Sequence, residues 1–193
     1  MSGRNTLSKL SRLFSVTLFY REMNTLEIGS VLQTDPFTCC LFGGVFAADR
    51  LPVKVSRPSL FIVNSDKASK PGEHWLAIYF PQRGPAEYFD SYGMRPFVRD
   101  HLNFIERNSV RWIHNDKKLQ GWGSLVCGQY CIMYALFRSR GVSMERYCSL
   151  FSTENPEMND RIVSKMFNAY VKKRNCVNYF SHCIQGCCAR ASN

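Results

Sequence analysis

Three residues whose side chains can together hydrolyse an acyl bond follow one another along the sequence: His74, Asp90 and Cys127. A carboxylate that accepts a hydrogen bond from one imidazole nitrogen fixes the ring tautomer and leaves the other nitrogen free to face a thiol. The resulting thiolate is the nucleophile. Each residue alone also fits a structural role in a strand start, a turn or an apolar helix. The prediction of catalysis therefore depends on whether the fold brings them together.

Gln120 precedes the cysteine by seven residues, on the loop that leads into the predicted helix. From this loop its amide can donate, beside the backbone N–H of Cys127, to an oxyanion that forms during attack on a carbonyl. One such donor lowers a reaction barrier by roughly 3 kcal/mol. The N-terminus of the helix also favours a negative charge on Cys127. We therefore expect Gln120 to complete the site.

The elements that must position these side chains are a hairpin and a helix. The runs 74–80 and 86–90 flank the turn-rich sequence PQRGP, which predicts two antiparallel strands. This pairing places His74 and Asp90 opposite each other, within a residue or two of register. An apolar helix is predicted to begin near Cys127 and to end at Gly141, and a helix that is apolar all round is buried.

The remaining periodicities predict further helices around a sheet. Helices are expected over 25–33, from Pro96 onward and in a last long segment capped by Asp160, and strands over 59–63 and 109–115. We expect an α+β fold in which a small mixed or antiparallel β-sheet packs on the central buried helix. The expected buried faces of the second and last helices are Phe97, Val98, Leu102 and Ile105, and Ile162, Val163, Met166, Phe167, Tyr170 and Val171.

Length and composition bound the kind of protein. The chain has 193 residues, of which 45% are hydrophobic, 13% aromatic and 21% charged, and these values exclude a disordered or fibrous protein. No run approaches the about 18 apolar residues of a membrane span, and residues 13–20 lack the features of a secretory signal. We therefore expect a protein that is neither secreted nor membrane-bound, with most of its nine cysteines as free thiols.

The positive charge is concentrated near the C-terminus. The formal net charge is +10, and residues 161–193 contain six basic residues and no acidic one. Such a segment attracts polyanions, although a solvated basic surface is the alternative. The candidate residues for contact with DNA are Lys165, Lys172, Lys173 and Arg174.

The motifs around the candidate catalytic residues resemble those of the adenain family, the adenovirus-type cysteine endopeptidases. They are His-Trp at 74–75, YFDSYG at 88–93 and Gln-Gly-x5-Cys-Gly at 120–128. The segments FGGVFAADRLP and AYVKKRNCVNYFSH also resemble parts of that family. The resemblance covers about residues 25–185. It implies a single endopeptidase domain over 25–193, with a basic C-terminal helix and a cysteine-rich tail, preceded by an N-terminal extension over 1–24.

The resemblance also carries functional expectations. It implies an adenain-like fold, a Cys127–His74–Asp90 triad with Gln120 in the oxyanion hole, and cleavage of viral precursor proteins after small residues during virion maturation. It further implies stimulation by double-stranded DNA and by an activating peptide, no metal or organic cofactor, a monomer, and location in the virion and the host nucleus. Either Trp75 or Trp122 is a candidate wall of the substrate cleft.

The chain departs from the adenain pattern at three positions. Asp90 stands where the family has Glu, Trp122 where it has Pro, and Ser109 where it has the cysteine that holds the activating peptide. A SUMO- or ubiquitin-like-protein protease of the same clan is the alternative, because those enzymes also have an Asp-Ser turn. Their Gln usually stands one residue nearer to the cysteine. A DNA-binding relative without catalysis is a further alternative.

The other cysteines carry weaker expectations. Cys39 and Cys40 lie in an apolar run and are expected in the core, and Cys131 is expected to pack one turn beyond Cys127. The tail contains no Cys-x2-Cys pair, so we predict no zinc site there and free thiols, with a disulfide as the alternative. The tail residues concerned are Cys176, His182, Cys183, Cys187 and Cys188.

Overall fold

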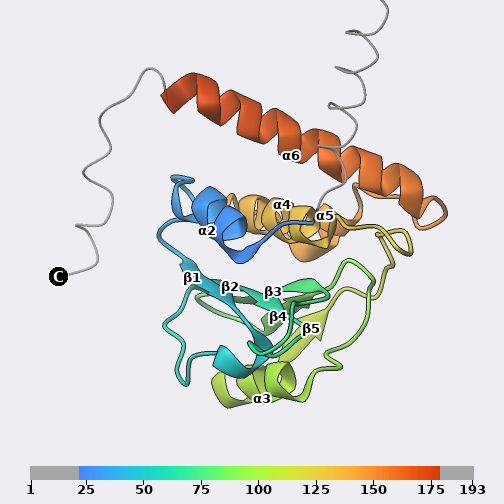
Figure 1. The fold of residues 1–193 in the computed structure, drawn as a ribbon. Coiled ribbons are helices and arrows are strands. Elements are labelled where there is room, and N and C mark those ends of the chain that lie inside the picture. Colours follow the sequence, from blue (N-terminus) through green and yellow to red (C-terminus); the bar gives the residue numbers. More distant parts are fainter. Residues whose placement is uncertain (1–21, 179–193) are drawn as a thin grey trace, which may run out of the picture.

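A computed structural model describes residues 22–178. The expectations for residues 1–21 and for the cysteines of the tail lie outside this part, and the side chain of Cys176 is not described either. Its centre is a five-stranded mixed sheet (Figure 1), in which β1 and β5 pair in parallel with their neighbours and β2, β3 and β4 are antiparallel. The strands, in sheet order, are β1 (Phe42–Phe46), β2 (Ser59–Asn64), β3 (Trp75–Phe80), β4 (Ala86–Phe89) and β5 (Trp112–His114).

The sheet is covered on both faces, which explains why its central strands are continuous apolar runs rather than alternating ones. All six residues of β3 are buried. Alternate residues of this strand point to opposite faces, so Trp75 and Ala77 belong to one hydrophobic core and Leu76 and Ile78 to the other. The α+β fold with a mixed sheet is therefore confirmed.

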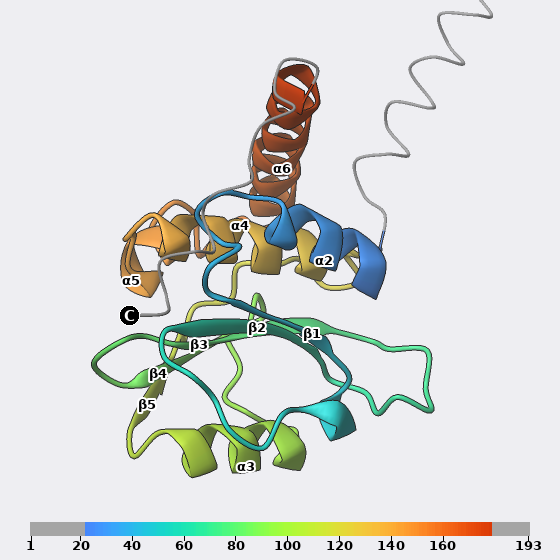
Figure 2. The same ribbon diagram turned by 90° about the vertical axis from the view of Figure 1, so that its left-hand side faces the viewer.

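Helix α4 (Cys127–Ser139) is the central element of the first core. Every residue from Cys127 to Leu136 is buried, and Gly141 just beyond the helix has the left-handed φ of +82° that ends it. Figure 2 shows α4 in one layer with α2 (Thr25–Gln33) and α5 (Met144–Cys148), between the sheet and α6 (Pro156–Asn178). The predicted buried helix that begins at Cys127 is confirmed.

The opposite face is covered by α3 (Arg99–Asn108) and the short 3-10 helix η1 (Ala48–Arg50) (Figure 2). Two predictions for α3 were wrong. The helix is capped by Val98 rather than starting at Pro96. Of the predicted buried face Ile105 is buried but Phe97 is 55% exposed, and His101 and Phe104 are buried instead. The reason is aromatic packing, because the Phe104 ring lies edge-on to both Phe61 and Phe80, at centroid distances of 5.4 Å.

The last helix begins earlier than predicted. Asn155, and not Asp160, accepts a hydrogen bond from the backbone of the first turn, from Met158 N at 3.0 Å. Asp160 is buried within the helix and binds a loop described below. The predicted buried face is confirmed in its central part, because Val163 is buried and Ile162, Met166, Phe167 and Tyr170 pack against the first core.

Helix α6 is fastened to α2 and α4 through a buried carboxylate. Asp35 accepts hydrogen bonds of 2.7 Å from both Arg140 Nη2 and Tyr170 Oη. Burial by itself would raise the pKa of Asp35, but these hydrogen bonds and the charge of Arg140 lower it. Arg174 donates to the Val31 carbonyl at 2.9 Å, near the C-terminal end of α2.

Three further sequence-based expectations are resolved by the packing. Cys131 is buried and its thiol donates to the Trp75 carbonyl at 3.2 Å, as expected for a packing residue. Cys40 is exposed and Cys39 only half-buried, so their placement in the core was wrong. Met23 is 4% exposed in the first core, so the packed chain begins ahead of residue 25.

None of the helices within residues 22–178 combines the length and apolar character needed to cross a bilayer.

Candidate active site

His74 and Asp90 lie at neighbouring ends of the β3–β4 hairpin. Ala77 pairs with Phe89, and continuing this register offsets His74 from Asp90 by two residues, within the predicted margin. The imidazole Nε2 donates to Asp90 Oδ1 at 2.7 Å, with His74 8% exposed and Asp90 fully buried. The hydrogen bond uses Nε2, so Nδ1 remains for another partner.

Asp90 is held in a tight turn by its own backbone and side chain. Its Oδ1 also accepts from Tyr92 N at 2.9 Å, and its carbonyl accepts from Gly93 N at 2.8 Å. Asn115 donates to the same carbonyl at 2.6 Å and accepts from Asp90 N at 2.9 Å. The carboxylate of Asp90 therefore both stabilises the turn and orients the imidazole of His74. These hydrogen bonds hold it in place without a ligand.

Cys127 completes the arrangement at the first residue of α4. It is 5% exposed and hydrogen-bonds to the imidazole of His74. Burial by itself would lower the pKa of His74. The hydrogen bonds to Asp90 and Cys127, together with the negative charges of these groups, outweigh burial and raise this pKa to about 9. The structure thus joins the three residues that the sequence analysis selected, in the order acid, imidazole and thiol.

Gln120 is linked to the same turn. Its side chain is fully buried, its Oε1 accepts from Ser91 Oγ at 2.6 Å, and its backbone N–H donates to the Ser91 carbonyl at 3.0 Å. The amide Nε2 donates to the Ser124 carbonyl at 2.7 Å. An amide nitrogen carries two hydrogens, so one donor remains beyond this bond. The contribution of Gln120 to an oxyanion hole stays a prediction.

Two residues of α6 hold the loop that carries Gln120, and the sequence analysis missed this role. Asp160 accepts from Gly121 N at 3.2 Å and from Tyr130 Oη at 3.1 Å, and Asn159 Nδ2 donates to the Leu119 carbonyl at 3.0 Å. Burial raises the pKa of Asp160, while its hydrogen bonds oppose that shift. The sequence signal for this role was the carboxylate of Asp160 beside the apolar face of the last helix. Its place just before that face favoured the interpretation as a helix cap instead.

A column of aromatic rings extends from the imidazole. Tyr92 packs on His74 with ring centroids 4.8 Å apart, and Trp122 stacks on Tyr92 at 5.1 Å with an angle of 20° between the planes. Trp122 is 75% exposed. The ammonium of Lys118 lies 4.0 Å from the centre of the Trp122 ring. The sequence selected Trp122 as a possible cleft wall, but nothing in it predicted the contact with Tyr92.

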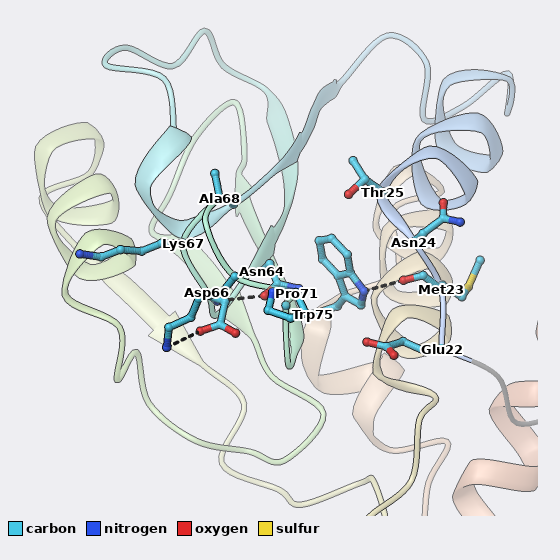
Figure 3. Close-up of a pocket in the computed structure, with 13 residues that line it drawn as sticks. Glu22, Met23, Asn24, Thr25, Asn64, Asp66, Lys67, Ala68, Pro71 and Trp75 are labelled. Carbon is cyan, nitrogen blue, oxygen red and sulfur yellow. Dashed lines mark hydrogen bonds and ion pairs between the residues drawn. The ribbon is translucent and has the colours of Figure 1, made fainter.

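A cavity of about 490 Å³ lies beside Trp75, the residue after His74 (Figure 3). The indole Nε1 of Trp75 donates to the Met23 carbonyl at 2.8 Å, and Glu22, Asn64, Asp66 and Lys67 are further lining residues. Two of its lining residues pack on the start of α4, because a Cβ at Gly128 would lie 3.1 Å from Met23 Cβ and 3.4 Å from Trp75. Trp75 therefore both lines the cavity and packs on the helix that begins at the candidate nucleophile.

The predicted DNA-binding residues differ in their surroundings. Lys165, Lys172 and Lys173 are exposed on α6. Arg174 is half-buried and donates to the Val31 carbonyl and to the Thr34 hydroxyl, so this side chain has a structural role between α6 and α2. Within residues 22–178 there is no cluster of three or more His, Cys, Asp or Glu side chains that would hold a metal ion.

Ser109, at the position of the adenain cysteine, has a structural role. It caps the C-terminus of α3, and its hydroxyl donates to the Arg111 carbonyl at 2.8 Å and accepts from Arg57 Nη2 at 2.9 Å. A hydroxyl cannot form a disulfide. An activating peptide would therefore have to bind without a covalent bond at this position.

The turn after Asp90 leads to a prediction about stability. Gly93 has a φ of +72°, and a Cβ there would lie 2.6 Å from the Lys117 backbone carbonyl carbon. We expect Gly93→Ala to lower the free energy of unfolding by about 2–4 kcal/mol, through left-handed strain and steric overlap. Gly84→Ala is the control, because Gly84 also has a positive φ but no atom within 4 Å. Equal losses for both variants in urea denaturation would contradict the steric account.

The Asp90–His74 pair leads to a prediction about titration. We expect the His74 imidazole to titrate near pH 9 in NMR spectra of the wild-type protein. Asp90→Asn removes a negative charge that favours the imidazolium, so the pKa of His74 should fall in this variant. His101 is the internal reference, because burial lowers its pKa to about 4 and its ring bonds to the Asn64 carbonyl. A His74 pKa that is the same in both proteins would refute the coupling.

No protein-family model and no curated protein sequence matches the chain. Among solved structures, the pS273R protease of ASFV is 25% identical with a TM-score of 0.41, over 57% of this chain and 45% of that one. The chain thus spans less than half the length of that protease. The central domain of the uncharacterized Lpg1148 protein from Legionella pneumophila is 13% identical with a TM-score of 0.42, over 81% of this chain and 98% of that one.

Proposed function

We propose that the protein is a cysteine endopeptidase. The observation that carries this proposal is the buried imidazole of His74, which is hydrogen-bonded to Asp90 at 2.7 Å and whose pKa is raised by its interaction with Cys127. A structural histidine needs only one satisfied partner, whereas this one joins a carboxylate to a thiol at a helix N-terminus. The arrangement is that of a nucleophile, its base and the group that orients the base.

In the proposed reaction the Cys127 thiolate attacks the carbonyl carbon of the scissile bond, and the carbonyl oxygen becomes an oxyanion. Gln120 and the backbone N–H of Cys127 would donate to it. His74 then protonates the departing amine, and the C–N bond breaks to leave a thioester. His74 next removes a proton from water, which attacks the thioester and releases the acid and the free thiol.

The pKa of His74 suits the proton-donating step. With a pKa of about 9, the imidazole of His74 is protonated at neutral pH. It can therefore give its proton to the amine without first taking one from solvent. Asp90 is the orienting group, since its Oδ1 binds both the ring and the turn that holds it.

The resemblance to the adenain family supports a more specific proposal, namely a viral enzyme that cleaves virion precursor proteins after small residues, in the particle or the host nucleus. The alternative within the clan is a ubiquitin-like-protein protease, and the Asp-Ser turn was the argument for it. That argument weakens, because the Ser91 hydroxyl donates a hydrogen bond to the side chain of Gln120. A glutamine at this place is common to both kinds of enzyme, so a serine that binds it does not favour either. The spacing between Gln120 and Cys127 continues to favour the viral enzyme.

Cleavage assays test the proposal directly. Two substrate panels, viral-type Gly-x-Gly peptides and ubiquitin-like precursors, are incubated with the full chain, with and without DNA. We expect Cys127→Ala and His74→Ala to abolish turnover, Asp90→Asn to retain part of it, and Gln120→Ala to lower kcat by roughly a hundredfold or more.

Cys40→Ala is the matched control, because it removes an exposed thiol outside the site and should leave turnover unchanged. Peptidase activity that persists in purified Cys127→Ala would exclude Cys127 as the nucleophile. Cleavage of the ubiquitin-like precursors alone would select the alternative within the clan.

We further propose that exposed basic residues of α6 bind double-stranded DNA. Replacing Lys165, Lys172 and Lys173 with Ala should weaken binding and lower the slope of log affinity against log salt by roughly three, about one for each phosphate contact. The control replaces three exposed basic residues elsewhere, Arg50, Lys54 and Arg83, and so removes the same charge. Binding measured by anisotropy that does not change with salt, or equal losses in both variants, would contradict a specific role for α6.

A further inference from the structure

Trp122 is exposed in a way that packing does not explain. Tryptophan is highly buried on average, yet this indole is 75% exposed while Trp75 is 6% exposed. It stacks on Tyr92, the ammonium of Lys118 lies over its ring, and it stands at the outer end of the ring column that begins at His74. A large apolar surface is thus presented to solvent two aromatic rings away from the candidate catalytic imidazole.

The backbone is held on the N-terminal side of Trp122, whereas the glycine on the other side has open space around it. The preceding Gly121 N–H is bound by the buried carboxylate of Asp160. The following Gly123 has a φ of +71°, and no atom lies within 4 Å of the position where its Cβ would be. A ring held by stacking beside an anchored backbone amide loses less freedom when a ligand binds than an unsupported side chain would, which favours binding.

From these contacts we propose that Trp122, supported by Tyr92, is the subsite that binds a large uncharged apolar side chain directly after the scissile bond. This inference rests on the proposed endopeptidase function. In that reaction His74 must reach the leaving amine, so the leaving segment of the substrate passes on the side of His74. Trp122 and Tyr92 are the rings stacked outward from that imidazole.

The cavity beside Trp75 is separate from the aromatic column. Neither Trp122 nor Tyr92 is among its lining residues, and it is bounded instead by Met23, Trp75 and polar side chains. Trp75 lines the cavity, and it directly follows His74, at which the column begins. A substrate segment bound to the aromatic column would therefore not occupy the cavity.

The chemistry of the column defines the side chain that it accepts. The exposed part of the Trp122 side chain and the half-exposed Leu125 in the same loop offer apolar contacts. The Lys118 ammonium, 4.0 Å from the ring centre, repels a second positive charge. We expect Leu or Phe to be preferred after the scissile bond, Gly to be weaker and Lys or Arg to be disfavoured.

The kinetic test uses peptides that are identical before the scissile bond and carry Leu, Gly or Lys directly after it. In wild-type protein kcat/KM should be roughly tenfold higher for Leu than for Gly, the usual effect of one apolar side chain in a subsite. Trp122→Ala should bring the Leu/Gly ratio close to one, and Trp122→Phe should restore part of it. Val110→Ala, at a fully exposed apolar residue outside the site, should leave the ratio unchanged.

A merely structural role for Trp122 predicts a different result. If Trp122 only supported Tyr92 and His74, Trp122→Ala would lower kcat/KM equally for all three peptides, and this result would overturn the subsite. A wild-type protein that does not distinguish Leu from Gly would overturn it as well.

Binding to the Cys127→Ala variant separates the subsite from catalysis. The affinities of the same peptides are measured by calorimetry with and without the additional Trp122→Ala change. If the Cys127→Ala variant binds Leu peptides more tightly through Trp122, while the wild-type protein cleaves no peptide, the subsite is retained and the proposed function is rejected. Cleavage together with equal affinities for Leu and Gly would do the reverse.

Discussion

The hydrogen bond between His74 and Asp90 is the constraint on which the rest of the structure depends. A buried carboxylate is stable only when it is paired or hydrogen-bonded, and Oδ1 of Asp90 satisfies this requirement through both the imidazole and Tyr92 N. The bond needs the β3–β4 hairpin in one register, because a shift by one residue would turn every side chain of a strand to the other face. The turn at Gly93 then fixes where Asp90 lies along that register.

Helix α4 is held against this hairpin along one face. The thiol of Cys131 donates to the Trp75 carbonyl, while a buried carboxylate, Glu87, accepts from a phenol at 2.6 Å and from a guanidinium at 2.8 Å. Residues spaced by three and four lie on the same side of a helix, so these contacts align the whole helix with β3 and β4. The face that touches the hairpin consists of Cys127, Cys131, Tyr134 and Arg138.

Helix α6 connects the outer layer of helices to the loop before the nucleophile. Near one end, Asn159 and Asp160 bind the loop that carries Gln120, and near the other, Tyr170 and Arg174 bind α2 and the residues after it. The exposed lysines lie on this same helix. A ligand that binds to α6 therefore contacts an element that already holds part of the candidate site.

Local sequence patterns determined most of the elements and the residue types of the candidate site, because strand runs, glycine stops and the hairpin turn depend on neighbours in the chain. They did not determine contacts between distant segments. The glycine pair in β1 concealed an edge strand, Phe104 rather than Phe97 faced the second core, and Asp160 bound a loop instead of capping its helix. The exposure of Trp122 was also decided by tertiary structure, since its position depends on Tyr92, a residue of a different loop. Burial and stacking arise only when such segments meet, which is why no periodicity in the chain encodes them.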